Sequence, residues 1–180
     1  SKVKVEPVGF PTREPLLAEG KVDSVTGFSF SSYLNLVRLG VPEEDISTIL
    51  MADHGLKLYG NAVIVNTDYA KNNSDMVKKF LVAIGAGWRD AIKDPKSAAA
   101  ALVKRNPAAD AALEQRRLQL AIDANVLTDY VRANGMGGVD SSRFAAAIEQ
   151  LSETYEYKAA PNAALYFTDE YLPASGISLN

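Results

Sequence analysis

Short apolar runs rich in β-branched residues alternate with amphipathic segments over the first 72 residues of the chain. Four such runs, bounded by Gly, Pro, Asp or Asn, have the composition of strands buried on both faces of a sheet. These predicted strands are Val3–Val8, Val22–Gly27, Ile46–Ala52 and Asn61–Asn66. Two segments, residues 12–20 and 31–40, are typical of helices that end at a glycine. The strand–helix alternation predicts a parallel or mixed sheet.

From residue 74 onward the apolar residues recur at helical spacing instead. Residues 74–93 carry one apolar stripe, which consists of Val77, Phe80, Leu81, Ile84, Trp88 and Ile92. Ser74 is the expected N-cap of this helix, and Asp140 is that of the last one. The four predicted helices occupy residues 74–93, 95–106, 110–127 and 140–155. The pattern therefore predicts an α/β region, residues 1–72, followed by a helical region, residues 73–180.

Composition excludes several classes of function. The chain has 180 residues, of which 47% are hydrophobic and 23% charged, as in globular proteins. Because 19 basic residues face 22 acidic ones without a basic cluster, a nucleic-acid partner is not expected. The chain contains no cysteine and one histidine, which argues against thiolate chemistry and a transition-metal site. We predict neither a metal nor a cofactor.

The first candidate site is the segment that follows the second predicted strand. Gly27, Phe28, Ser29, Phe30 and Ser31 would lie at the carboxyl end of that strand, where open α/β sheets bind ligands. The hydroxyls and the amides of the helix start could hold an anionic or carbonyl group, and the two phenylalanines could stack on a ring. The residues alone leave a structural alternative open, in which the serines cap the helix and the phenylalanines belong to the core.

A second group of polar side chains follows the third predicted strand. Asp53, His54, Tyr59 and Asn61 can each make directed hydrogen bonds and are weaker candidates for ligand binding. A structural alternative, in which Asp53 and His54 are solvent-exposed turn residues, stays open. A hydrolase is not indicated, because adjacent Asp and His residues project differently from a turn and no Gly-x-Ser-x-Gly motif is present.

Three motifs carry a resemblance to a known family. The segments GKVDSVTGF (20–28), YGNAVIVN (59–66) and FTDEYLP (167–173) are similar to substrate-binding proteins of ABC importers in the thiamine-pyrimidine-precursor, nitrate, sulfonate and taurine superfamily. The resemblance extends over nearly the whole chain. It implies part of a bilobal, type II periplasmic-binding-protein-like fold, in which residues 1–72 complete the second lobe and residues 73–180 return to the first. The N-terminal portion of the first lobe and the first part of the second lobe are then expected upstream of Ser1.

The resemblance also implies a function. By position, Gly27 to Ser31 would form one wall of an interlobe cleft in a non-enzymatic, periplasmic or extracytoplasmic protein that delivers its solute to a membrane permease. A small heteroaromatic solute, such as a pyrimidine or thiamine precursor, is favoured because the two candidate loops lack the arginine that an oxyanion calls for. Uncovered strand edges would promote self-association, for example by exchange of the C-terminal helices about residues 66–74.

Three alternatives remain open. The first is nitrate, sulfonate or taurine binding, and the second is a ligand-sensing effector domain of a transcription regulator with the same bilobal fold. The third is a catalytic relative, the pyrimidine-precursor synthase, which uses a cysteine-rich motif that this chain lacks.

Overall fold

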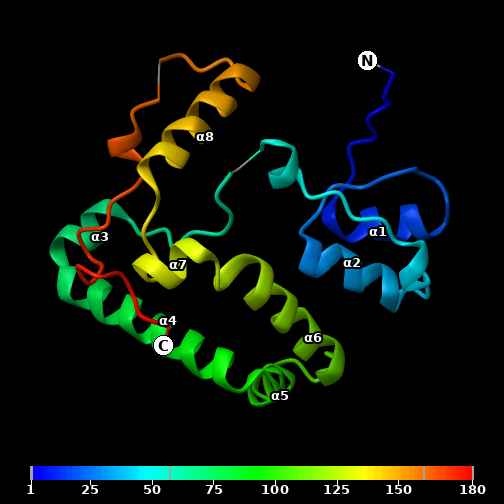
Figure 1. Ribbon diagram of the computed structural model, residues 1–180, viewed down its shortest axis with the longest axis horizontal. Coiled ribbons are helices and arrows are strands. Elements are labelled where there is room, and N and C mark those ends of the chain that lie inside the picture. The colour runs from blue at the N-terminus through cyan, green and yellow to red at the C-terminus, as the bar shows by residue number, and fades with distance from the viewer. Residues whose placement is uncertain (1, 57, 160, 180) are drawn as a thin grey trace.

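The computed structural model describes residues 2–56, 58–159 and 161–179, and α-helices dominate it (Figure 1). The α-helices are α1 (Phe10–Ala18), α2 (Ser29–Arg38), α3 (Thr67–Asn72), α4 (Ser74–Lys93), α5 (Pro95–Arg105), α6 (Ala111–Ala121), α7 (Asp129–Asn134) and α8 (Ser141–Thr154). Short 3₁₀ turns are η1 (Glu43–Asp45), η2 (Met51–His54) and η4 (Ala163–Leu165), and α6 continues into a π-helical turn, η3 (Ile122–Val126). None of the helices in the described residues is long and apolar enough to cross a membrane.

The predicted α/β fold is wrong. Within the described residues, the only β-type pairing is an isolated antiparallel bridge between Met136 and Ile177. The predicted strands are instead extended or bent segments, and part of the third forms η2. A strand is stable only when neighbouring strands bind its N–H and C=O groups, and no described segment does so here. Their apolar side chains are accordingly exposed, Val5 by 79% and Ile64 by 91%. The sheet-based bilobal architecture therefore does not describe this structure.

The six predicted helices are confirmed, but α3 forms within the segment expected to be a hinge, residues 66–74, and α7 was not predicted. α1 and α2 are followed by Gly20 and Gly40, whose φ angles of 67° and 88° lie in the left-handed region that glycine adopts without strain. The four helices predicted in the second region correspond to α4, α5, α6 and α8. Asp140 caps α8 by accepting a hydrogen bond from the Arg143 amide at 2.7 Å. Ser74, however, is the first residue of α4 rather than its N-cap.

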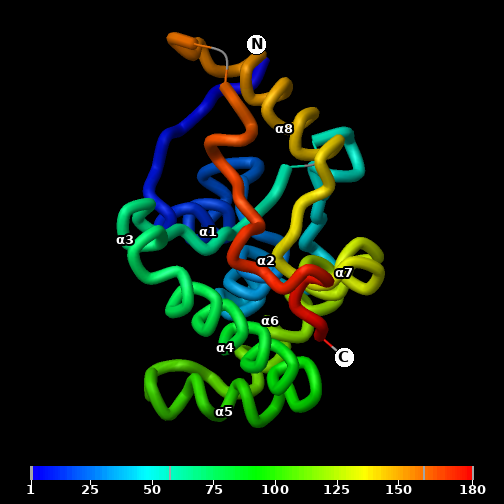
Figure 2. Tube along the Cα trace, turned by 90° about the vertical axis from the view of Figure 1, so that its left-hand side faces the viewer, coloured from blue at the N-terminus to red at the C-terminus, as the bar shows by residue number. Residues whose placement is uncertain are grey.

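The helices pack as a chain of neighbours rather than around one large core. α4 contacts α5, α5 contacts α6, α6 contacts α2, and α2 contacts α1 (Figures 1 and 2). Leu34 of α2 is fully buried in this arrangement, and Ala99 of α5 and Ile122 of η3 are also buried. In both views α8 lies at the end of the molecule opposite α5.

The C-terminal segment returns to α4. Ile177 is buried, and its Cγ2 atom would lie 2.1 Å from a Cβ atom added to Gly85. Arg89 of α4 donates a hydrogen bond to the Ser178 carbonyl at 2.9 Å. Gly135 has a φ of 76° and packs so closely that an added Cβ would lie 2.6 Å from the carbonyl oxygen of Ser175. The C-terminal segment thus packs closely against α4 at Gly85 and against the end of α7 at Gly135, and both contacts require a glycine.

Candidate functional site

A cavity of about 530 Å³ lies among α2, α4, α5 and α6. Large apolar side chains of three helices line it, namely Ile84 and Trp88 of α4, Leu102 of α5 and Leu118 of α6. Phe30, in the first turn of α2, lines it as well. Its size falls in the range of small-molecule sites, roughly 300–1,000 Å³, and such sites are mainly apolar with a few polar groups. We take this cavity as the candidate functional site.

Small residues create the space. Gly87 and Ala91 of α4, Ala98 and Ala99 of α5, and Ala121 of α6 all line the cavity. Helices normally close the space between them by interdigitating long side chains. A glycine and four alanines on the facing surfaces cannot fill that space. The alanine-rich sequence of α5 therefore contributes to the site as well as to helix propensity.

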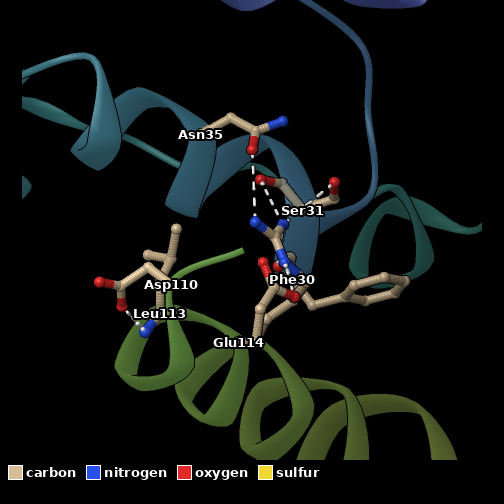
Figure 3. A network of polar contacts seen from close by, with 7 residues as sticks. Phe30, Ser31, Asn35, Asp110, Leu113 and Glu114 are labelled. Carbon is tan, nitrogen blue, oxygen red and sulfur yellow. Dashed lines mark hydrogen bonds and ion pairs between the residues drawn. The ribbon is translucent and has the colours of Figure 1, made fainter. Parts of the chain in front are cut away.

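One ion pair forms the polar edge of the cavity. Arg117 donates from Nε to Glu114 Oε2 at 3.1 Å, and both side chains are mostly buried. Arg117 Nη1 also donates to the carbonyl oxygens of Phe30 and Ser31, at 3.4 and 3.3 Å, and Nη2 donates to Asn35 Oδ1 at 3.4 Å. Figure 3 shows Phe30 and Ser31 near Glu114, with Asn35 one turn further along α2. Arg117 thus connects α6 to the beginning of α2.

The first predicted group lies at this edge. Phe28 precedes α2, is 52% exposed and stacks on Phe30, with ring centroids 5.4 Å apart. Ser31 is held by Arg117, whose Nη1 lies 3.3 Å from its hydroxyl oxygen. Ser29 is the first residue of α2, and no side-chain cap bond is present at this helix start. Of the predicted residues, Phe30 is the one that lines the cavity.

Gly27 has a structural role. A Cβ atom at this position would lie 1.9 Å from the hydroxyl oxygen of Ser32. Ser32 Oγ in turn donates to Glu14 Oε1 of α1 at 2.6 Å, and Glu14 is only 5% exposed. Position 27 therefore requires glycine, because a larger residue would overlap Ser32, whose hydrogen bond to Glu14 joins α2 to α1.

The second predicted group lies elsewhere. The Tyr59 hydroxyl accepts a hydrogen bond from the Asp140 amide at 2.8 Å, and its ring lies 4.4 Å from the Arg143 guanidinium. Tyr59 therefore anchors its segment to the start of α8. The other three residues, Asp53, His54 and Asn61, are exposed on η2 and on the extended segment after it. The structure does not bring them to the cavity.

Sequence reasoning missed the polar edge and placed Trp88 only on the apolar stripe of residues 74–93, not in a candidate site. Glu114, Arg117, Leu118 and Ala121 all line the cavity, and their spacing of i, i+3, i+4 and i+7 places them on one helix face. A charged pair one turn apart on an otherwise apolar face was the signal that could have found the site. In residues 2–56, 58–159 and 161–179, no group of three or more His, Cys, Asp or Glu side chains could hold a metal ion.

The sequence profile of the NMT1/THI5-like family matches residues 1–98, which is more than half of the 180-residue chain. The chain therefore belongs to this family. Membership fits a substrate-binding role in the broad sense, since these proteins are mainly binding proteins rather than enzymes. Searches among curated proteins and among solved structures found no match. The matched range includes Phe30 and Trp88, whereas Glu114 and Arg117 lie beyond it.

Proposed function

We propose that this protein binds a small heteroaromatic solute, of the pyrimidine or thiamine-precursor kind, in the cavity among α2, α4, α5 and α6. The observation that carries the proposal is that two aromatic side chains, Phe30 and Trp88, line one mainly apolar cavity that also has a single polar edge. A planar ring can stack on either aromatic face, while the polar edge can bind its heteroatoms. Phe28 would support Phe30 from outside by ring stacking.

In this proposal the protein is the binding component of an ABC importer and passes its solute to a membrane permease. The family supports a location outside the cytoplasm, because its members are generally extracytoplasmic binding proteins. The proposal requires no cofactor and no chemical step.

One observation favours a second candidate, an oxyanion solute such as nitrate, a sulfonate or taurine. Arg117 lies at the cavity, and arginine is the side chain that binds such anions with two parallel hydrogen bonds. The choice between the two solute classes therefore depends on whether the contacts of Arg117 within the protein leave it able to bind an anion.

The proposal can be tested by fluorescence, because Trp88 is the only tryptophan of the chain. Titration with an aminopyrimidine should change its emission saturably. Phe30→Ala should weaken binding by about 1–3 kcal/mol through the loss of stacking. Phe80→Ala is a matched control, since Phe80 lies on α4, is 54% exposed and does not line the cavity. An emission that does not saturate, or equal losses in both variants, would contradict the proposal.

A further inference from the structure

We propose that the cavity selects ligands that carry a positive charge or an N–H donor, and that Glu114 is the residue that binds this group. In this inference Arg117 is a positioning residue, which holds Glu114 and the start of α2 but does not contact the ligand. The inference rests on the proposed function, because it concerns the same cavity.

The first argument is that the guanidinium of Arg117 is already engaged. Its Nε donates to Glu114, its Nη1 to the Phe30 and Ser31 carbonyls, and its Nη2 to Asn35. All three nitrogens therefore donate hydrogen bonds within the protein, and the charge is compensated by Glu114. An incoming anion would find at most the second N–H group of Nη2, too few donors for two parallel hydrogen bonds, and it would lie beside the Glu114 carboxylate. Arg117 is thus poorly suited to bind an oxyanion.

The second argument is that one carboxylate oxygen of Glu114 is available to accept a hydrogen bond from a ligand. Its Oε2 atom accepts from Arg117, whereas Oε1 makes no hydrogen bond within the described part of the chain. The side chain is only 18% exposed and lines an apolar cavity. A carboxylate oxygen in such surroundings gains more from a donor than one in open water does. An N–H group of a ligand would satisfy it.

The third argument is that the aromatic walls favour the same sign of charge. The faces of Phe30 and Trp88 carry negative electrostatic potential, which attracts cations and N–H groups that lie over the ring. The carboxylate and both rings line the same cavity. The cavity therefore combines three features that prefer a positively charged or N–H-bearing ring over an anionic one.

The experiment compares two probes of nearly equal shape and opposite charge, benzamidine and benzoate, by calorimetry. Benzamidine should bind at least about tenfold more tightly, as expected for a hydrogen bond to a charged group. Glu114→Gln, which keeps the size of the side chain, should reduce that preference about tenfold. Glu43→Gln is the matched control, because Glu43 pairs with Arg116 on an exposed face of α6 and does not line the cavity. It should leave the preference unchanged.

A third variant tests the role of Arg117. Arg117→Met should keep or increase the preference for benzamidine, because the carboxylate remains. If Arg117 instead bound the ligand, this variant would weaken benzoate selectively, and the inference would be overturned. The comparison of the two probes on the wild-type chain also tests the inference without any variant.

The remaining outcomes separate this inference from the proposed function. If benzoate binds as tightly as benzamidine, or more tightly, the charge preference is wrong, while a saturable pyrimidine titration would still support solute binding. If the pyrimidine binds and benzamidine does not, the inference is likewise wrong. If none of the probes binds and the emission of Trp88 does not respond, the proposed function fails and the inference fails with it.

Discussion

The extended segments, residues 3–8, 46–50 and 61–66, differ sharply from the bundle formed by α2, α4, α5 and α6. In the sequence both have clear apolar patterns. In the structure, Leu34 of α2 is fully buried, whereas Ile49 and Ile64 of the extended segments are 77% and 91% exposed. An apolar pattern therefore accompanied burial at Leu34 but not at Ile49 or Ile64.

The difference lies in where backbone hydrogen bonds are made. A helix satisfies its N–H and C=O groups within one segment, so that a local pattern together with a neighbouring helix specifies it. A strand depends on a second segment in the correct register, and sequence periodicity does not say whether that segment is available. A strand-like sequence therefore indicates only a composition until the segment that pairs with it has been identified.

The largest effect on stability is expected for a substitution at a fully buried position of the bundle. Leu34→Ala should lower the free energy of unfolding by about 2–5 kcal/mol, because it leaves a cavity at a fully buried position. Leu165→Ala is the same change at a residue that is 77% exposed, and it should alter stability by less than about 0.5 kcal/mol. Urea denaturation measures both. Similar losses in the two variants would show that the bundle is not the stable part of the molecule.

A second pair of variants distinguishes two glycines of α4. Gly85→Ala should destabilise the protein by about 1–3 kcal/mol, because the new methyl group would overlap Ile177 Cγ2. Gly87→Ala meets no atom within 4 Å and should stabilise α4 by up to about 1 kcal/mol through helix propensity. Thermal unfolding should therefore shift in opposite directions. A stabilising Gly85→Ala would mean that the C-terminal segment does not pack on α4 in solution.

The extended segments should also make the chain self-associate, since exposed apolar residues and unpaired strand-like backbone promote association. Ile64→Lys should weaken this association by about tenfold or more, because a buried isoleucine contributes about 1.5–3 kcal/mol. Sedimentation velocity over a range of concentrations measures the effect. Gln115→Lys, which adds the same charge on an exposed position of α6, is the control. A wild-type chain that stays monomeric throughout would contradict this prediction.

Six of the α-helices could be predicted from the sequence, whereas α3, α7 and the tertiary architecture could not. The apolar stripe of residues 74–93 and the acidic cap at Asp140 are local signals, and both correspond to helices in the structure. The sheet was predicted from Val3–Val8 and Asn61–Asn66, whose β-branched composition is compatible with a strand but cannot supply its partner. The loss of that sheet also removes the basis for the interlobe cleft.

The candidate site was predictable only in part. Phe30 was predicted to contact ligand because it would follow the carboxyl end of a strand, and it lines the cavity although that strand is absent from the described residues. Asp53 and His54 were chosen for their chemistry, yet the hydrogen-bonding capacity of a side chain does not determine where the fold places it. Glu114 and Arg117 lie more than 80 residues from Phe30 in the sequence. Their proximity arises from the packing of α6 against α2, which no local pattern encodes.

The smallest effect on stability is expected for the ion pair between Glu43 and Arg116, which joins η1 to α6. Hydrogen bonds from Arg116, and to a lesser extent from Tyr33, lower the pKa of Glu43 from 4.5 to about 2. Because the folded-state pKa lies below the unfolded one, the pair contributes its full stability above about pH 4.5. That contribution is lost as the pH falls toward 2. The pair is exposed, so the effect should be small and should weaken further in high salt.

The melting temperature of Glu43→Gln should therefore lie below that of the wild type at pH 6, and the difference should shrink between pH 5 and pH 2. Glu44→Gln, the same substitution one residue away and also in η1, controls for the loss of one negative charge. If the difference between wild type and Glu43→Gln stays constant across this pH range, the carboxylate does not hold η1 on α6. The segment before η2 would then be attached to the bundle through α2 rather than through this ion pair, and the contrast between extended segments and bundle would be sharper than the structure indicates.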